Sequence, residues 1–303
     1  SKAATQGTYN NKPYKGTTFE ISDGGFMGWL VGSGTYDIIS VSSDELIVRV
    51  IEDPASGSGA AWYHKFTSTK PVKGATYTYN NLVWEDDFTT AGPDPTKWTY
   101  DLGAGGWGNG ELQTYTNSSE NVVVENGSLK IKAKANGAGY TSARLKSEGL
   151  YEFKYGRVEI RAKLPNAQGT WPAFWMLGAD FPTVGWPASG EIDIMEQKGT
   201  DKTKIHGTVH YPGNSGGNGP TKSTAITNAS TEFHNYTVEW SDTKIEFFLD
   251  GVSYHVFTND ATKPFNKDYF LILNLAMGGT LGGTVDPAFT EDFIEIDYVK
   301  VYQ

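Results

Sequence analysis

The stretch Gly190-Glu191-Ile192-Asp193-Ile194-Met195-Glu196 decides the fold. Acidic and apolar residues alternate, which in a β-strand places Glu191 and Asp193 on one face and Ile192 and Ile194 on the other. Glu196 breaks this period of two. One extra residue at Ile194-Met195, accommodated as a β-bulge, would return Glu196 to the face of the other acids. We therefore predict a strand with an apolar face and a row of three carboxylates on the opposite face.

Further strand-like runs lie on both sides of this stretch. They cover residues 45–51, 121–124, 129–133, 156–162, 236–240, 244–249, 270–275 and 293–302. Turn signals such as Asn126-Gly127, Asn136-Gly137 and Asp250-Gly251 separate several of them. Since no long segment has helical periodicity, we predict an all-β protein whose antiparallel sheets pack as a sandwich.

The character of the sequence changes near residue 80. Strand-like segments at 35–41, 45–51 and 61–66 lead into a connector rich in Thr, Tyr and Asn at 67–81. We expect a small β-rich module of unknown role at 1–80 and a second domain at 81–303. The rings of Trp29, Trp62 and Tyr63 either form a sugar-binding surface or serve packing, within the module or against the second domain.

Composition excludes several classes of protein. The 303 residues hold 25 Lys and Arg against 35 Asp and Glu, a net charge of −10, which argues against a nucleic-acid partner. Cys is absent, which excludes disulfides, thiolate zinc sites and cysteine catalysis. No apolar stretch is long enough for a membrane span. Ser1 opens no signal sequence, so we expect a mature form trimmed at its N-terminus.

Two further patterns suggest sites that their context argues against. Gly103, Gly105 and Gly108 spell G-x-G-x-x-G, but a strand-like segment follows where a dinucleotide loop needs a helix. His206 and His210 have the spacing of a helical metal pair, but their segment reads as a strand, where such residues lie about 13 Å apart. We therefore expect no zinc site, although either His can serve singly.

The three acids suit glycoside hydrolysis, which needs a carboxylate nucleophile and a carboxylic acid at the leaving oxygen. The alternatives are a solvated polar face or a calcium cluster, and Ca²⁺ ligands normally come from a flexible loop. Trp171, Trp175 and Trp186 precede the acids. Indole rings pack against the apolar faces of sugars, although any one Trp is as readily a core residue. Together these residues favour a site that binds and cuts a polysaccharide.

The segment Trp186-Pro-Ala-Ser-Gly-Glu-Ile-Asp-Ile-Met-Glu196 resembles the active-site signature of glycoside hydrolase family 16, in the laminarinase form with one extra residue. Other segments resemble the family in the same order, at 106–116, 141–145, 155–165, 171–177, 274–279 and 296–302. The resemblance covers about residues 82–303. It implies a jelly-roll β-sandwich with a concave substrate cleft and a retaining mechanism.

The resemblance also implies roles for individual residues. Glu191 would be the nucleophile, Glu196 the acid/base and Asp193 the helper between them. The matching substrate-binding residues are Asn109, Arg144, Trp171, Trp175, Trp186 and His210. Gly110 departs from the Asn that commonly follows Asn109 in the family. No cofactor is implied for catalysis.

A structural calcium is common in the family, on the convex side of the sandwich. The matching positions here are Asp87, the carbonyl of Gly127, and Asp297. Asp87 stands where Glu is more usual.

From these observations we expect an endo-acting retaining β-glucanase that hydrolyses β-1,3- or mixed β-1,3/1,4-glucans. One alternative is a family-16 hydrolase acting on agar- or carrageenan-type galactans or on xyloglucan. Another is a non-catalytic β-glucan-binding protein, which is less favoured because all three acids are present. We expect a monomer, secreted or at the cell surface, whose partner is a β-glucan polysaccharide or oligosaccharide.

Overall fold

The computed structural model describes residues 78–303 in full and, before them, six strands. The chain divides into two compact units, Ser1–Tyr77 and Thr78–Gln303. In the first unit β1 (Thr5–Tyr9) pairs with β2 (Lys12–Gly16). A four-stranded antiparallel sheet is formed by β3 (Thr18–Ile21), β4 (Gly34–Val41), β5 (Glu45–Val50) and β6 (Tyr63–Thr67). The side chains of Trp29, Trp62 and Tyr63 lie outside the described residues.

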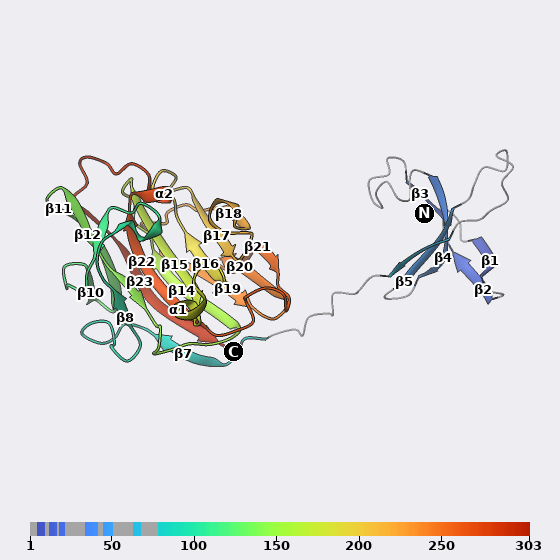
Figure 1. Cartoon of the computed structure of the whole chain (residues 1–303), viewed down its shortest axis with the longest axis horizontal. Helices are drawn as coiled ribbons and strands as arrows, with labels where there is room; N and C mark the ends of the chain where they lie inside the picture. The colour runs from blue at the N-terminus through green and yellow to red at the C-terminus, as the bar shows by residue number, and fades with distance from the viewer. Residues whose placement is uncertain are drawn as a thin grey trace. The chain divides into compact units, whose positions relative to one another are not determined.

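The second unit consists of two sheets packed face to face (Figure 1). The seven-stranded sheet has the order β18 (Thr221–Ala225), β17 (Lys204–His210), β16 (Glu191–Glu196), β15 (Thr170–Gly178), β22 (Tyr269–Met277), β13 (Arg144–Lys146) and β8 (Thr99–Asp101). It carries the three acids.

The second sheet has ten strands. Its main path is β21 (Val252–Thr258), β20 (Lys244–Leu249), β19 (His234–Trp240), β14 (Gly156–Lys163), β23 (Glu291–Tyr302), β11 (Ser128–Asn136), β12 (Gly139–Ser142) and β9 (Gln113–Tyr115). In addition, β10 (Val122–Glu125) pairs with β11, and β7 (Leu82–Asp86) pairs with β23. Short helical segments lie at η2 (Gly106–Gly108), α1 (Phe181–Val184), η3 (Gly216–Asn218) and α2 (Gly279–Gly282).

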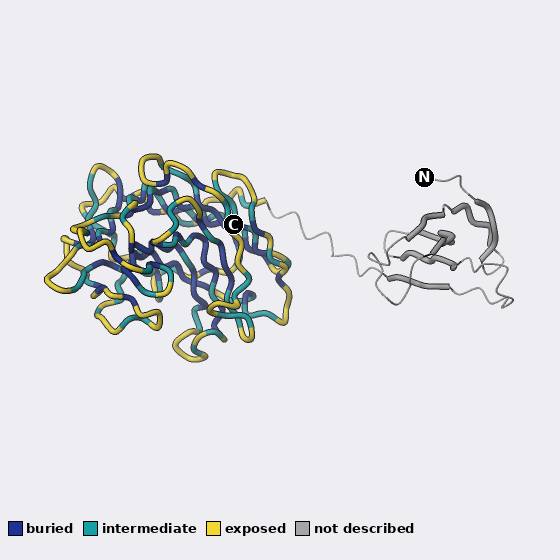
Figure 2. Tube along the Cα trace, turned by 90° about the horizontal axis from the view of Figure 1, so that it is seen from above, coloured by how far each residue is buried: buried dark blue, intermediate teal, exposed yellow. Residues whose placement is uncertain are grey.

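The core lies between the two sheets. The strands are largely buried, and the turns that connect them are exposed (Figure 2). Ile192, Ile194 and Met195 contribute to it from β16, each at most 1% exposed. Burying such side chains removes apolar area from water, which is the main favourable term in folding. The predicted antiparallel sandwich is confirmed. Among the described strands, β9 and β12 form the one parallel pair.

The predicted hairpin at Asp250-Gly251 joins β20 to β21, and both residues have positive φ, as a two-residue hairpin turn requires. Strand β15 was not among the predicted strands. Its burial pattern is almost continuous because it lies in the middle of its sheet, so it lacks the alternation that marks a strand with one wet face.

The bulge in β16 lies where the sequence predicts it. Against β17, Asp193 pairs with Thr208 and Glu196 with His206, so β16 carries one residue more than its neighbour. Against β15 the pairing also shifts, between Phe174 and Trp175. Both shifts fall at Ile194-Met195, so these two residues enter the core while Glu196 regains the outer face.

A cross-strand row then runs over the whole seven-stranded sheet at the level of Glu196. Successive register partners are Asp101, Arg144, Asn274, Ala173, Glu196, His206 and Ser223. Since neighbouring strands lie about 4.8 Å apart, Arg144 lies three strands, or about 14 Å, from Glu196. The register thus aligns charged and polar residues along a line perpendicular to the strands.

Gly207 in β17 faces the other sheet. A Cβ atom there would lie 2.8 Å from Cδ1 of Phe247 and 2.8 Å from the hydroxyl oxygen of Tyr254. Because this overpacks the core, we expect Gly207→Ala to lower the melting temperature by about 3 to 10 °C. Gly217→Ala is the matched control, since a Cβ at this exposed position in η3 meets nothing within 4 Å. Calorimetry on both variants checks this. If Gly207→Ala melts at the same temperature as wild type and Gly217→Ala, the close contact between the sheets is contradicted.

Candidate active site

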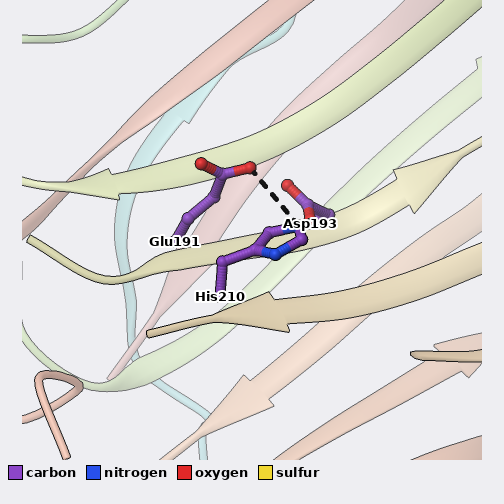
Figure 3. A group of neighbouring side chains, drawn as sticks. All are labelled: Glu191, Asp193 and His210. Carbon is purple, nitrogen blue, oxygen red and sulfur yellow. Dashed lines mark ion pairs between the residues drawn. The ribbon is translucent and has the colours of Figure 1, made fainter. Parts of the chain in front are cut away.

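Glu191, Asp193 and His210 form a compact group on the outer face of the sheet (Figure 3). Nε2 of His210 lies 3.1 Å from Oδ2 of Asp193 and 3.8 Å from Oε1 of Glu191. The pairing of β16 with β17 sets this contact, because Glu191 lies directly opposite His210. One ligand atom from each lies within 4.8 Å of the others, but an imidazole nitrogen is a poor ligand for Ca²⁺. The geometry therefore favours an acid–imidazole network over a calcium cluster.

Two of the predicted tryptophans hydrogen-bond the outer acids. Trp186 donates from Nε1 to Oε2 of Glu191 at 2.8 Å, and Trp171 donates from Nε1 to Oε1 of Glu196 at 3.0 Å. Trp171 is only 7% exposed, whereas Trp186 is 47% exposed. Trp171 thus acts on Glu196 from a buried position, and Trp186 offers an open ring beside Glu191.

Burial dominates the electrostatics of the three acids. It raises the pKa of Glu191 well above its ordinary value, and the Asp193 carboxyl adds to this rise. The pKa of Asp193 is also raised, by burial and then by the charge of Glu196. Burial, followed by the charge of Glu191, raises the pKa of Glu196 to about 7. Grouped carboxyls in such a site resist ionising together, so one or more stays protonated near neutral pH.

Arg144 lies at the other end of the polar row. Its Nε is 2.9 Å from Oδ2 of Asp101. Its guanidinium carbon lies 5.0 Å from the ring centroid of Trp107 and 4.6 Å from that of Trp175. A planar cation held against two rings is well placed for both stacking and hydrogen bonding.

Asn109 lies in the loop that contains the rejected dinucleotide pattern. Here the three glycines have positive φ, as does Trp107, and the chain continues into β9 without a helix that could bind a phosphate. The loop is an irregular turn that exposes Asn109 on the same side of the protein as Arg144. Trp107 in this loop was not among the predicted site residues.

The site also contains buried polar residues that were not predicted. Glu111, Tyr115 and Asn274 are 9%, 1% and 6% exposed. Asn274 is the one polar side chain in the buried interior of β22 apart from its terminal Tyr269, which was a usable signal. Nothing in the local sequence ties Glu111 to Asn274, because only the fold brings them together.

The three predicted calcium positions lie near one part of β23. Val299 pairs with Asp86, which precedes Asp87, and Ile296 pairs with Leu129, two residues after Gly127. The oxygens offered there suit Ca²⁺. However, Asp297 already hydrogen-bonds and ion-pairs with Arg161, so a calcium ion would have to share this carboxylate.

Comparisons with known proteins give the class. The model of glycosyl hydrolases family 16 matches residues 109–300. A β-glucanase of Rhodothermus marinus is 44% identical over 243 residues, which are 73% of this chain and 85% of that protein. The chain belongs to glycosyl hydrolases family 16.

Two solved structures show the same fold. A laminarinase from Flavobacterium sp. UMI-01 has a TM-score of 0.71 at 41% identity, and the match covers 74% of this chain and 100% of the laminarinase chain. The laminarinase catalytic domain of Thermotoga maritima MSB8 has a TM-score of 0.68 at 41% identity and covers 74% and 98%. The second unit is therefore the jelly-roll sandwich that the sequence resemblance implies.

The raised pKa of Glu196 predicts a stability effect. Its folded pKa of about 7 exceeds the ordinary 4.5, so wild-type stability falls as pH rises between these values. Glu196→Gln removes this cost and keeps an acceptor for Trp171. We expect the variant to melt about 3 °C or more above wild type at pH 8, with no difference near pH 4.

The matched control is Glu120→Gln. Glu120 is exposed, and its hydrogen bond to Lys134 lowers its pKa, so removing its charge should not stabilise the protein. Differential scanning calorimetry across pH checks both variants. A melting temperature of Glu196→Gln that follows wild type at every pH would show that Glu196 ionises without cost.

Proposed function

We propose that this protein is an endo-acting, retaining β-glucanase that hydrolyses β-1,3- or mixed β-1,3/1,4-glucans. The observation that carries the proposal is the row of Glu191, Asp193 and Glu196 on one sheet face, with indole donors on the two outer acids. No catalytic cofactor is needed for this chemistry.

Glu191 acts as the nucleophile. The hydrogen bond that Nε1 of Trp186 donates to Oε2 of Glu191 favours the charged form of Glu191. Asp193 acts as the helper between the two glutamates, and burial and then the charge of Glu196 raise the pKa of its carboxyl, which favours its neutral form. His210, 3.1 Å from Asp193, keeps that carboxyl oriented toward Glu191.

Glu196 acts first as acid and then as base. Its pKa of about 7 leaves a large protonated fraction near neutrality, so it donates a proton to the leaving glycosidic oxygen while Glu191 bonds to the anomeric carbon. The now-ionised Glu196 then takes a proton from water, which attacks the same carbon and releases Glu191. Two inversions at this carbon give net retention.

The sugars on the non-reducing side bind at Asn109, Arg144 and Trp175. Arg144 lies about 14 Å along the polar row from Glu196, and Trp175 lies opposite Asp193 on the neighbouring strand. Trp186 contributes an exposed ring beside Glu191. Similarity to the β-glucanase and laminarinases named above favours glucan over the galactan and xyloglucan alternatives. The complete acid row argues against a binding protein without activity.

We also propose that the protein works outside the cell, because a polymeric glucan cannot cross a membrane. We further propose that it acts as a monomer. Among the described residues no helix has the length and apolarity of a membrane span. A calcium ion held by Asp87, the Gly127 carbonyl and the Asp297 carboxylate, which also pairs with Arg161, would stabilise the fold far from the acids.

A reducing-sugar assay tests the activity. We expect hydrolysis of laminarin, lichenan or cereal β-glucan and much slower release from agarose and xyloglucan, with the β-anomer as first product by proton NMR. Glu191→Gln keeps the shape of the side chain and should lower turnover by several orders of magnitude. A first product with α configuration, or substantial turnover by this variant, would overturn the assignment.

Chelation tests the calcium proposal. Because an ion bound only to the folded form stabilises it, EDTA should lower the melting temperature of wild type and leave activity at low temperature unchanged. Asp87→Asn, which alters an exposed ligand and leaves the Asp297–Arg161 pair intact, should melt identically with and without EDTA. Identical wild-type melting curves under both conditions would remove the site.

A further inference from the structure

Glu111 is a buried carboxylate that the mechanism above does not use. It is 9% exposed and accepts three hydrogen bonds from neutral side chains. The donors are Nδ2 of Asn109 at 3.0 Å, Nε2 of Gln113 at 2.6 Å and the hydroxyl of Tyr115 at 3.2 Å. In the fully described part of the chain, residues 78–303, Glu111 has no ion pair with Lys or Arg. Burying a carboxylate without a direct cation is costly, which calls for a reason.

The hydrogen bonds continue from Glu111 to the sheet. The Tyr115 oxygen accepts from Nδ2 of Asn274 at 3.0 Å, and Oδ1 of Asn274 accepts from Nε1 of Trp175 at 2.7 Å. The chain Trp175, Asn274, Tyr115, Glu111 thus joins strands β15, β22 and β9 to the loop that carries Asn109.

The two ends of this chain fix its direction. An indole N–H can only donate and a carboxylate can only accept, so the amide of Asn274 and the hydroxyl of Tyr115 each have one orientation that satisfies every bond. The same carboxylate also takes one N–H of Asn109 and leaves the amide oxygen of Asn109 directed elsewhere. An amide in place of the carboxylate would add donors at the one point where the network needs only acceptors.

The loop has other attachments that do not need the Glu111 side chain. Leu112 N donates to the carbonyl of Met277 at 2.8 Å, and Thr280 N donates to the carbonyl of Asn109 at 3.0 Å. These backbone bonds hold the loop against the end of β22. The side-chain network therefore controls the orientation of Asn109 and Trp175 more than the attachment of the loop.

We propose that Glu111 is a positioning residue that couples Asn109 and Trp175 into a single binding unit for the sugars on the non-reducing side of the scissile bond. This inference rests on the proposed glucanase function. The Glu111 carboxylate fixes the orientation of the exposed Asn109 amide by a direct hydrogen bond. Through Tyr115 and Asn274 it also fixes the indole ring of Trp175, against which Arg144 stacks. A carboxylate is required at this position because only a side chain without donors can accept hydrogen bonds from both Asn109 and Tyr115.

Binding to an inactive background tests the proposal without turnover. In the full chain carrying Glu191→Gln, titration calorimetry with laminaritetraose should show about tenfold weaker binding when Glu111→Gln is added. Asn109→Ala in the same background should also weaken binding. The variant that combines Glu111→Gln with Asn109→Ala should lose less affinity than the product of the two single losses, because Glu111 acts partly through Asn109. Glu120→Gln, the same exchange at an exposed site, should bind as the background does.

Kinetics of the active chain separate positioning from a general structural defect. Glu111→Gln should raise KM about tenfold while kcat changes less than about threefold, with a melting temperature within a few degrees of wild type. Tyr115→Phe provides a second variant, since it removes the hydroxyl that links Glu111 to Asn274 and leaves the bond to Asn109 intact. It should give a smaller rise in KM, and it keeps the proposal testable if Glu111→Gln does not fold.

The outcomes are distinct from those of the proposed function. If wild type hydrolyses no glucan, the functional proposal fails. If wild type is active and both folded variants keep its KM and its oligosaccharide affinity, the inference on Glu111 is wrong. A fall in kcat with unchanged KM also overturns it, because that result would place Glu111 in the chemical step.

Discussion

The bulge at Ile194-Met195 is the constraint on which the rest of the structure depends. Strand β16 must bury Ile192, Ile194 and Met195 between two sheets and still keep Glu196 on the outer face. A regular strand cannot do both, because its side chains alternate strictly. The extra residue resolves the conflict, and the pairing of β16 with both neighbours absorbs it. Core packing and catalysis are therefore set by the same local irregularity.

The rest of the site adjusts the chemistry of the acids that this strand presents. Burial opposes the ionisation of these carboxyl groups, so keeping them in the site lowers the stability of the fold. Active sites commonly lower stability in this way. Trp171 and Trp186 return part of this cost by donating hydrogen bonds to Glu196 and Glu191. In the proposed mechanism, these environments divide three similar carboxyl groups into nucleophile, helper and acid/base.

The polar network around Glu111 is proposed to position the sugar-binding residues Asn109 and Trp175. Asn109 and Trp175 lie far apart in the sequence, and each alone could adopt several orientations. A chain of hydrogen bonds with a fixed direction leaves one arrangement, at the expense of a buried charge. In the proposed function, the sugar-binding residues and the acids lie on strands of one sheet, whose register sets the spacing between them.

The sequence by itself determined the all-β class, the bulge and the acid row, because these follow from side-chain alternation over a few neighbouring residues. It also predicted Arg144 and the tryptophans, through the resemblance of short segments to a family. Only the tertiary structure decided that Trp171 donates to Glu196, that Arg144 lies against Trp107 and Trp175, and that Glu111 reaches Asn274. These contacts join residues from separate strands and loops, so their existence depends on sheet order and register, which local sequence patterns do not encode.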